Sequence, residues 1–423
     1  MGALALAACG GGSGGSAEEG SGTGSISVWA HEGQEGEVDA LKNAVEAFNS
    51  SQSDIEVELR LIPEADYTKT VQATSVGDLP DVLEYDGPLL ASFAYDGKLS
   101  PISDFVSADT LENQTASVLA QNTYVGDGEL YGLSMFDSGL GIYGNKALLD
   151  AAGVEYPTTW QDAWTDEEFT AALEALAAED DDGKVLDIKE NYGGEWPAYG
   201  FLPIVASAGA EVIVDNSADS LTSDPVVSAV DTFASWRDYV DPNSDDTSFV
   251  DGNVALSWVG HWMYPAYDDA IGEDLVVMPL PDFGNGTKSG QGSWAWGISS
   301  ATDNASAAGK FLDALMADTA VGEMTDVNGA PPATASALAA SELYKEGGPL
   351  QLFADQLAAT CGTDAPTPDC VTVPRPITPG YAVISAEFSE AFFSAYQGGD
   401  TADLLGKAAA SIDVEFKDND NFE

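Results

Sequence analysis

Segments with strand and helix periodicity alternate along most of the chain, and this alternation restricts the fold more than any other feature. Near the start, SISVWA at 25–30 and the alternating apolar run at 55–61 predict two strands. Between them, Leu41, Val45 and Phe48 repeat at helical spacing. A strand, a helix and a strand in such close succession predict a parallel strand pair joined by a right-handed crossover.

Further segments continue this alternation as far as residue 317. The same reasoning predicts strands at 80–86, 139–144, 254–260, 275–281 and 293–299, and helices at 167–179, 226–240 and 305–317. A chain of 423 residues, of which 44% are apolar, has material for about two or three domains with buried cores. The sequence therefore predicts an α/β fold divided into two lobes.

The charge of the chain argues against several classes of partner. Lys and Arg number 14 against 71 Asp and Glu, which gives a formal net charge of −57. Such a field repels phosphate backbones, anionic membrane surfaces and acidic ligands, so nucleic-acid binding is not expected. Nine Trp, fifteen Tyr and sixteen Phe are spread along the chain, which argues against disorder. The composition therefore indicates a folded protein with a hydrated, negative surface.

The first of the three cysteines stands in an apolar context near the start of the chain. Cys9 follows Leu6-Ala7-Ala8 and precedes Gly10. This pattern resembles a bacterial lipobox, whose cysteine receives a lipid anchor; the alternative is a chance cysteine in an alanine-rich segment. Only eight residues precede Cys9 and none is Lys or Arg, so we expect the first Met to be internal to a longer signal peptide.

A polar, glycine-rich stretch follows Cys9. Residues 10–24 read GGGSGGSAEEGSGTG, which predicts a flexible tether with a mean reach of about 20 Å. An anchor followed by such a tether describes a protein held at a membrane face but working in water. Outside this region there is no run of 18 apolar residues, so no membrane-spanning helix is expected.

The other two cysteines are close together in the chain. Cys361 and Cys370 lie in TCGTDAPTPDC, and in an exported chain this spacing predicts a local disulfide that closes a loop. No His lies nearby and the spacing is not that of a zinc hairpin, so a metal pair is not expected.

Several longer sequence segments, taken in order, resemble the pattern of one protein family. That family's pattern begins with a strand, a polar loop, a helix and a second strand, as this chain does. Two later features are also similar to it: the PDV segment with a following acidic residue, and the turn Tyr143-Gly144-Asn145-Lys146 that precedes PTTW. The matching segments are 25–59, 77–102, 130–160, 249–263, 276–299, 328–337 and 374–392. Together they resemble the extracellular solute-binding proteins of ABC importers, in the carbohydrate-binding group similar to maltose-binding protein.

The resemblance implies a two-lobed, type II periplasmic-binding-protein fold with the ligand cleft between the lobes. Three crossings between lobes are expected near 134–138, 298–301 and 329–333. The expected first lobe is 25–134 plus 301–328, the second is 137–297 plus 334–423, and 1–24 is a truncated lipoprotein signal with its linker. Closure on ligand would then be a hinge motion, stabilised by contacts that exist only with ligand present.

Aromatic side chains near the expected crossings are candidates for ligand contact. A sugar presents hydroxyls at its rim and C–H groups on its faces, so its cleft needs flat aromatic rings and carboxylates or amides. Trp258, His261 and Trp262 lie along or just after a predicted strand, where they either face the cleft or pack in the second core. Trp294 and Trp296 share one side of another strand, and the alternative for Trp296 is again the core.

Polar candidates follow the strands of the first lobe and the first crossing. Glu32 and Gln34 come after the first strand, and Asp86 ends the third, at the carboxyl edge where α/β proteins bind ligands. A solvated loop acid is the alternative for both carboxylates. Asp137 and Ser138 occupy the first crossing and would hydrogen-bond at the cleft floor.

One of the few arginines is also a candidate. Arg60, Arg237 and Arg375 are the only three in the chain, and Arg375 stands between two prolines. It is either a donor to sugar oxygens or a structural partner of an acid.

Enzymatic and metal-binding interpretations find less support. No carboxylate pair is singled out for glycoside hydrolysis, and neither histidine is accompanied by a G-x-S-x-G nucleophile motif. Residues 178–190 do not form an EF-hand calcium loop. With Gly183 at the sixth position of such a loop, Ala178 takes the first position and Lys189 the twelfth, where calcium ligands with carboxylate groups are needed. No P-loop is present either. We therefore expect no catalytic residue, no metal and no cofactor.

The expected function is that of a monomeric, lipid-anchored binding protein at the extracellular face of a bacterial membrane. Its ligand would be a neutral mono- or oligosaccharide, delivered to the permease subunits of an ABC transporter. The alternatives are a secreted glycoside hydrolase and a binding protein for a non-sugar solute; an anionic solute would require cationic side chains that this chain offers sparingly.

Overall fold

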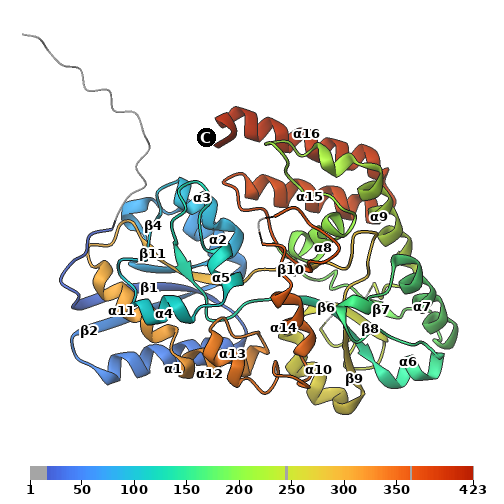
Figure 1. Cartoon of the computed structure of the whole chain (residues 1–423), viewed down its shortest axis with the longest axis horizontal. Helices are drawn as coiled ribbons and strands as arrows, with labels where there is room; N and C mark the ends of the chain where they lie inside the picture. The colour runs from blue at the N-terminus through green and yellow to red at the C-terminus, as the bar shows by residue number, and fades with distance from the viewer. Residues whose placement is uncertain (1–16, 243–245, 363, 423) are drawn as a thin grey trace, which may run out of the picture.

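The computed structural model describes residues 17–242, 246–362 and 364–422, and it contains two lobes that lie side by side in Figure 1. The expected lipidation site, Cys9, and most of the expected tether lie outside the described residues. Among the described helices, none combines the length and apolar character needed to cross a bilayer.

The first lobe is built on one mixed sheet. Its strands run in the order β2-β1-β3-β11-β4, with β5 beside β11: β1 (Gly24–Glu32), β2 (Ile55–Pro63), β3 (Val82–Asp86), β4 (Leu99–Ser100), β5 (Gly132–Leu133) and β11 (Trp294–Ser299). Its helices are α1 (Glu35–Ser51), α2 (Glu64–Ala73), α3 (Leu90–Tyr95), α4 (Ala108–Asn113), α5 (Ala116–Gln121), α11 (Ala305–Leu315), α12 (Asp318–Asn328) and α13 (Ala335–Ala340).

The second lobe contains a four-stranded sheet and a smaller two-stranded one. The larger runs β7-β8-β6-β9 and the smaller pairs β10 with β12: β6 (Leu140–Asn145), β7 (Leu186–Asp187), β8 (Leu256–Gly260), β9 (Leu275–Met278), β10 (Ser289–Gln291) and β12 (Thr372–Pro374). Its helices are α6 (Lys146–Ala152), α7 (Asp166–Glu179), α8 (Trp196–Ser207), α9 (Asp224–Ser235), α10 (Tyr264–Ile271), α14 (Gln351–Ala358), α15 (Tyr381–Tyr396) and α16 (Thr401–Asp418).

The strand–helix–strand unit predicted at the start of the chain is confirmed. β1 and β2 pair in parallel from Gly24 opposite Ile55 to Glu32 opposite Pro63, with α1 between them in sequence. Ile26 and Val28 on β1 point into the first core, as the alternation of the strand requires. β3 also runs parallel to β1. The carboxyl ends of β1 and β3 therefore lie at the same edge of the sheet.

The second expected crossing, at 298–301, is wrong. β11 pairs antiparallel with β3, from Trp294 opposite Asp86 to Ile298 opposite Val82, so this strand belongs to the first lobe rather than the second. The chain therefore passes between the lobes before β11, at 292–293. Strand periodicity locates such a segment but does not show which sheet receives it.

The third crossing between the lobes is expected at 329–333, but the structure places it later in the chain. α13 still packs on the first lobe, where Ala337 joins the core and Asn113 exchanges hydrogen bonds with Ser336. Tyr344 is the next residue that is buried in the second core. The passage into the second lobe therefore follows α13, and residues 334–340 belong with the first lobe.

Part of the expected tether is packed against the first lobe. The carbonyl oxygens of Glu18 and Glu19 accept hydrogen bonds from the first two N–H groups of α11, which have no partner inside the helix. Gly20 has φ of +67°, and a Cβ there would lie 2.4 Å from the Asp303 carbonyl oxygen, so only glycine fits this approach. The expectation of a free linker is therefore wrong for residues 17–24.

The disulfide predicted from the cysteine spacing is confirmed. Cys361 and Cys370 are bonded, and their loop leads into β12 and then to Arg375. The crosslink therefore restricts the segment that carries this arginine.

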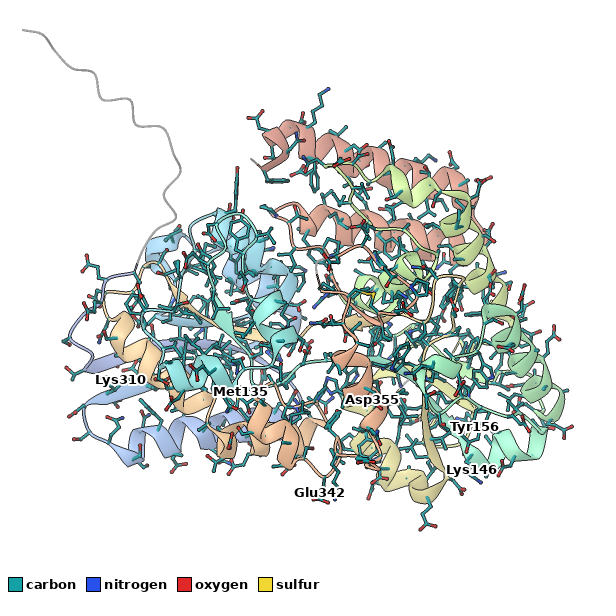
Figure 2. All side chains as sticks on the ribbon, viewed as in Figure 1. Met135, Lys146, Tyr156, Lys310, Glu342 and Asp355 are labelled. Carbon is teal, nitrogen blue, oxygen red and sulfur yellow. A yellow bond between two sulfur atoms is a disulfide. The ribbon has the colours of Figure 1, made fainter. Side chains whose placement is uncertain are left out.

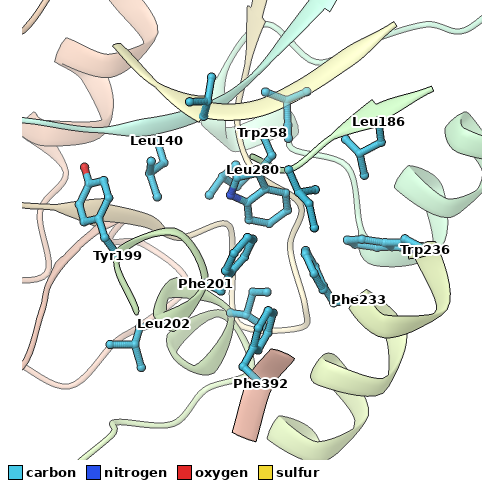
Figure 3. Close-up of a cluster of buried hydrophobic side chains, with 14 of the residues drawn as sticks. Leu140, Leu186, Tyr199, Phe201, Leu202, Phe233, Trp236, Trp258, Leu280 and Phe392 are labelled. Carbon is cyan, nitrogen blue, oxygen red and sulfur yellow. The ribbon is translucent and has the colours of Figure 1, made fainter. Parts of the chain in front are cut away.

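An aromatic cluster forms the centre of the second core (Figure 3). Phe201 of α8 stacks on Phe392 of α15 with 4.8 Å between ring centroids, and Phe233 of α9 meets the edge of Trp258 at 5.6 Å. Trp258 has no exposed surface, and its indole N–H donates to the Gly200 carbonyl oxygen at 3.2 Å. The expectation that Trp258 contacts ligand is therefore wrong.

We expect Trp258→Ala to lower the free energy of unfolding by about 3–5 kcal/mol, because it removes a buried aromatic side chain and leaves a cavity. Urea denaturation followed by far-ultraviolet circular dichroism measures this loss. A variant as stable as the parent would contradict the placement of this side chain in the core.

Candidate functional site

The carboxylate of Asp137 ties together segments that connect the lobes. Its oxygens accept hydrogen bonds from Ser117 Oγ at 2.7 Å and from the backbone N–H of Gly292, at the second passage. Its own N–H donates to the carbonyl oxygen of Pro331, in the loop between α12 and α13, at 2.8 Å. Burial raises the pKa of Asp137 to about 6, although these hydrogen bonds oppose the shift. With 1% of its surface exposed, Asp137 is a hinge residue, and its expected ligand contact is wrong.

Arg375 joins the two lobes through an ion-paired cluster. Its two terminal nitrogens donate to both carboxylate oxygens of Asp86, at the end of β3, at 2.6 and 2.9 Å. One of these nitrogens also lies 3.1 Å from Glu195 Oε1, just before α8. Tyr381 and Ser385 of α15 donate to the Glu195 carboxylate as well. Arg375 is thus a structural partner of acids at the surface between the lobes, and its role as a donor to sugar oxygens stays a prediction.

A second-lobe wall of aromatic rings lies next to this cluster. The guanidinium of Arg375 lies 5.0 Å from the ring centroid of Tyr199, whose hydroxyl is 2.7 Å from Ser138 Oγ. Trp262 packs against Tyr199 at 6.2 Å and edge-on against Trp196 at 6.0 Å. Trp262 is only partly buried, whereas Trp196 and Tyr199 are buried behind it. The available face of this wall is therefore that of Trp262.

A first-lobe aromatic pair lies beside Asp86. Trp294 stands opposite Asp86 in the β3–β11 register and is partly buried. His31, at the end of β1, stacks on it with 3.9 Å between centroids and 13° between ring planes. Trp296 on the same strand is 2% exposed and lies in the first core, so its expected ligand contact is wrong.

His261 also connects the two lobes. Its Nδ1 is 3.1 Å from the carbonyl oxygen of Asn328, the last residue of α12, and its ring lies 6.2 Å from Phe136. It is 3% exposed, and burial lowers its pKa to about 4, so it is neutral at pH 7. This imidazole is a packed contact between the lobes, and only its neighbour Trp262 keeps a partly exposed ring.

The remaining first-lobe candidates are exposed. Glu32 ends β1, and Gln34 precedes α1, where its N–H donates to Glu37 Oε2 at 2.9 Å. Glu37 also accepts from Asn328 Nδ2 at 3.0 Å. The structure thus places Glu32 and Gln34 at the rim of the first-lobe edge rather than in the Arg375 cluster.

Two buried donors near the hinge have no hydrogen-bond partner among the described residues. They are Arg375 Nε and Gln121 Nε2. A Cβ added to Gly292, whose φ is +138°, would lie 3.8 Å from Arg375 Nε and 3.7 Å from Gln121 Oε1. Both side chains therefore approach the same glycine, and an oxygen atom from a ligand or a water beside Arg375 Nε would satisfy that donor.

A cavity of about 300 Å³ lies beside the cluster, and Tyr199 and Arg375 form part of its wall. Apolar residues of α8 and of the segment after β12, such as Leu202, Ala206 and Ile377, line part of the rest. Within the described ranges, no group of three or more His, Cys, Asp or Glu side chains is arranged to hold a metal ion.

Several residues of this site escape sequence reasoning. Glu195, Tyr199 and His31 join the site through contacts between segments that are far apart in the chain. A weak signal exists for two of them, since Glu195 and Tyr199 belong to EWPAY, where an acid and aromatic residues begin an apolar helix. For His31, its place next to Glu32 after β1 was the only indication.

Comparisons with known proteins agree on the family and the fold. A family model described as bacterial extracellular solute-binding protein matches residues 43–349. A maltooligosaccharide ABC transporter solute-binding lipoprotein of Streptococcus pneumoniae is 27% identical over 255 residues, or 57% of this chain and 56% of the relative. The maltotriose-binding protein of Pyrococcus abyssi is 24% identical over 274 residues, or 62% and 54%. The chain thus spans little more than half the length of these relatives.

Solved structures extend the likeness to nearly the whole chain. The cyclic alpha-maltosyl-1,6-maltose binding protein from Arthrobacter globiformis superposes with a TM-score of 0.73 at 22% identity, covering 93% of this chain and 99% of that one. At this identity the likeness concerns the fold. The two-lobed, type II periplasmic-binding-protein architecture expected from the sequence is confirmed.

The two histidines should titrate at opposite ends of the accessible pH range. We expect the imidazole of His261 to protonate only near pH 4, since burial favours its neutral form, and stability to fall as the pH drops from ~6.5 through that value. His31 should keep its proton up to about pH 9. Because the chain has two His, the C2–H resonances in proton NMR resolve both, and His261→Asn assigns them. Titration of both near pH 6.5 would contradict these environments.

Replacement of Arg375 should separate the lobes. In Arg375→Met the carboxylates of Asp86 and Glu195 lose their shared cation, and we expect the free energy of unfolding to fall by about 1–3 kcal/mol, less than for a fully buried pair because both acids retain some solvent contact. Small-angle X-ray scattering should show a larger radius of gyration.

The matched control is the triple variant Asp86→Asn, Glu195→Gln, Arg375→Met, which removes all three charges. It should regain most of the lost stability. Equal losses in both variants would mean that packing of the arginine side chain, and not its charge, joins the lobes.

Proposed function

Because the chain belongs to the family of bacterial extracellular solute-binding proteins, we propose that it captures a neutral sugar outside the cell and delivers it to the permease of an ABC importer. The observation that carries this proposal is that partly exposed indoles from both lobes adjoin the cluster of Arg375 and its carboxylates. Trp262 comes from the second lobe, and Trp294 with Asp86 comes from the first. Such a pairing matches the C–H faces and the hydroxyl rim of a sugar ring.

The charge of the site favours an uncharged ligand. Arg375 is the cation at the centre of the cluster, and it already faces two carboxylates. An anionic group would meet a net negative surface, in a chain with an overall charge of −57. Neutral hydroxyls, in contrast, can donate charge-assisted hydrogen bonds to these carboxylates and are not repelled by their charge.

The arrangement of the acids supports binding rather than hydrolysis. Glycosidases need one carboxyl group that is free to give a proton and a second that attacks or activates water. Asp86 and Glu195 are instead held by the same guanidinium, and Glu195 accepts two further hydroxyl donors. We therefore propose a role without bond breaking, which is also the role that the names of the relatives describe.

The ligand class is proposed from those relatives. Their names specify maltooligosaccharides and maltotriose, so glucose oligomers of this kind are the first sugars to test. The buried donors Arg375 Nε and Gln121 Nε2 are candidates to meet ligand oxygens at the junction of the lobes. A monomer attached to the outer face of the membrane through Cys9 completes the proposal; the lipoprotein name of the S. pneumoniae relatives supports the anchor.

A thermal-shift panel tests this proposal. The panel contains maltose, maltotriose, other neutral sugars, sugar phosphates and peptides. A bound sugar at 100 times its dissociation constant should stabilise the folded protein by about 2.7 kcal/mol. Trp262→Ala should weaken binding by about 2 kcal/mol, or roughly 30-fold, because it removes an aromatic contact surface.

The matched control is Trp262→Phe, which keeps an aromatic ring and should lose less affinity. Both variants should melt near the parent temperature without ligand, because Trp262 is only partly buried. If sugar phosphates or peptides shift the melt and no neutral sugar does, the proposed ligand class is wrong.

A further inference from the structure

His31 covers one face of Trp294. The imidazole and indole planes are within 13° of parallel and their centroids are 3.9 Å apart, which leaves no room for a ligand ring between them. Tyr67 of α2 meets both rings edge-on, at 6.3 Å from His31 and 5.8 Å from Trp294. The partly exposed indole therefore has only its other face available to a ligand.

The orientation of His31 is set by a buried carboxylate. Nδ1 of His31 lies 2.7 Å from Glu84 Oε2, and the same oxygen accepts the backbone N–H of His31 at 3.1 Å. Tyr67 also donates its hydroxyl to the Glu84 carbonyl oxygen at 2.7 Å. Glu84 is 4% exposed, so it requires a charged or strongly donating partner. These bonds leave the imidazole with a single orientation.

Acidic groups from several elements face the imidazole. They are Glu84 on β3, Glu37 on α1 and Glu64 on α2. A Cβ on Gly33 would lie 3.0 Å from His31 Nε2 and 2.5 Å from Glu37 Oε2, so the second ring nitrogen points toward the Glu37 side. Burial lowers the pKa of His31, but the combined acids overcome it and raise the pKa to about 9. His31 is thus an imidazolium at neutral pH.

A charged planar ring stacked on indole is held more firmly than a neutral one. The attraction between a cation and the indole face adds to the packing of the two rings. Because Glu84 fixes His31 and His31 fixes Trp294, the indole plane is set before any ligand arrives. A preset contact surface lowers the ordering cost of binding.

We propose that His31 is a positioning residue, which clamps the indole of Trp294 between itself and the ligand so that one fixed face receives a sugar ring. This inference rests on the proposed sugar-binding function. It assigns His31 no direct contact with the sugar. It makes binding depend on the charge of the imidazole and therefore on pH.

Isothermal titration calorimetry with maltotriose, or with the sugar that gives the largest thermal shift, tests the role of His31. His31→Gln keeps a donor for Glu84 but loses the charge and the stacked ring, and we expect about tenfold weaker binding. His31→Arg keeps both the charge and a planar group that stacks on indole, so it should bind within about threefold of the parent.

The pH profile separates this role from a purely structural one. Affinity of the parent should fall as the pH rises from 8 through 9, because the imidazolium loses its proton. His31→Arg should show no such decline over this range, since its guanidinium stays charged. Level profiles for both proteins would overturn the proposal.

A double-variant cycle tests whether His31 acts through Trp294. In a Trp294→Ala background, His31→Gln should cause little further loss of affinity, because the ring that it positions is gone. Additive losses would overturn the proposal. If the parent binds sugar and His31→Gln binds equally well, the inference fails while the proposed function stands; if the parent binds none of the sugars, both fail. Melting curves without ligand identify any variant that does not fold.

Discussion

The guanidinium of Arg375 between Asp86 and Glu195 is the interaction on which the relation of the two lobes depends. It is 7% exposed, and it joins the carboxyl end of a first-lobe strand to the start of a second-lobe helix. On the hinge side, Asp137 holds the first and second passages and the α12–α13 loop together. The lobes are thus joined at two places by charged groups, and the partly exposed rings of Trp262 and Trp294 lie beside the Arg375 cluster.

The extreme acidity of the chain bears on the class of ligand proposed for this arrangement. Side chains with oxygen tips point outward around both lobes in Figure 2, and water and counterions screen the exposed carboxylates among them. Within the site, the cations are few and each faces carboxylates: Arg375 in the junction and His31 behind Trp294. A site composed in this way presents hydroxyl acceptors and aromatic faces rather than free positive charge. The acidic composition thus supports the proposal of an uncharged ligand.

Local patterns in the sequence predict the elements well and their assembly less well. The β1–α1–β2 unit, the disulfide and most strands follow from periodicity and spacing, because these depend on neighbours in the chain. Trp258 and Trp262 show the limit: they are four positions apart, yet one is fully buried and the other partly exposed, since β8 ends between them. The lobe that receives β11, and the pairing of Glu195 with Arg375, depend on contacts between distant segments, which no local pattern encodes.

The central claim is that a sugar is held between the lobes, against aromatic faces that the charged groups position. A crystal structure of the protein with bound maltotriose tests this most directly. The account predicts sugar rings between the lobes, in contact with Trp262 and with the face of Trp294 opposite His31. A sugar bound on one lobe alone, or one that contacts neither indole, would contradict it.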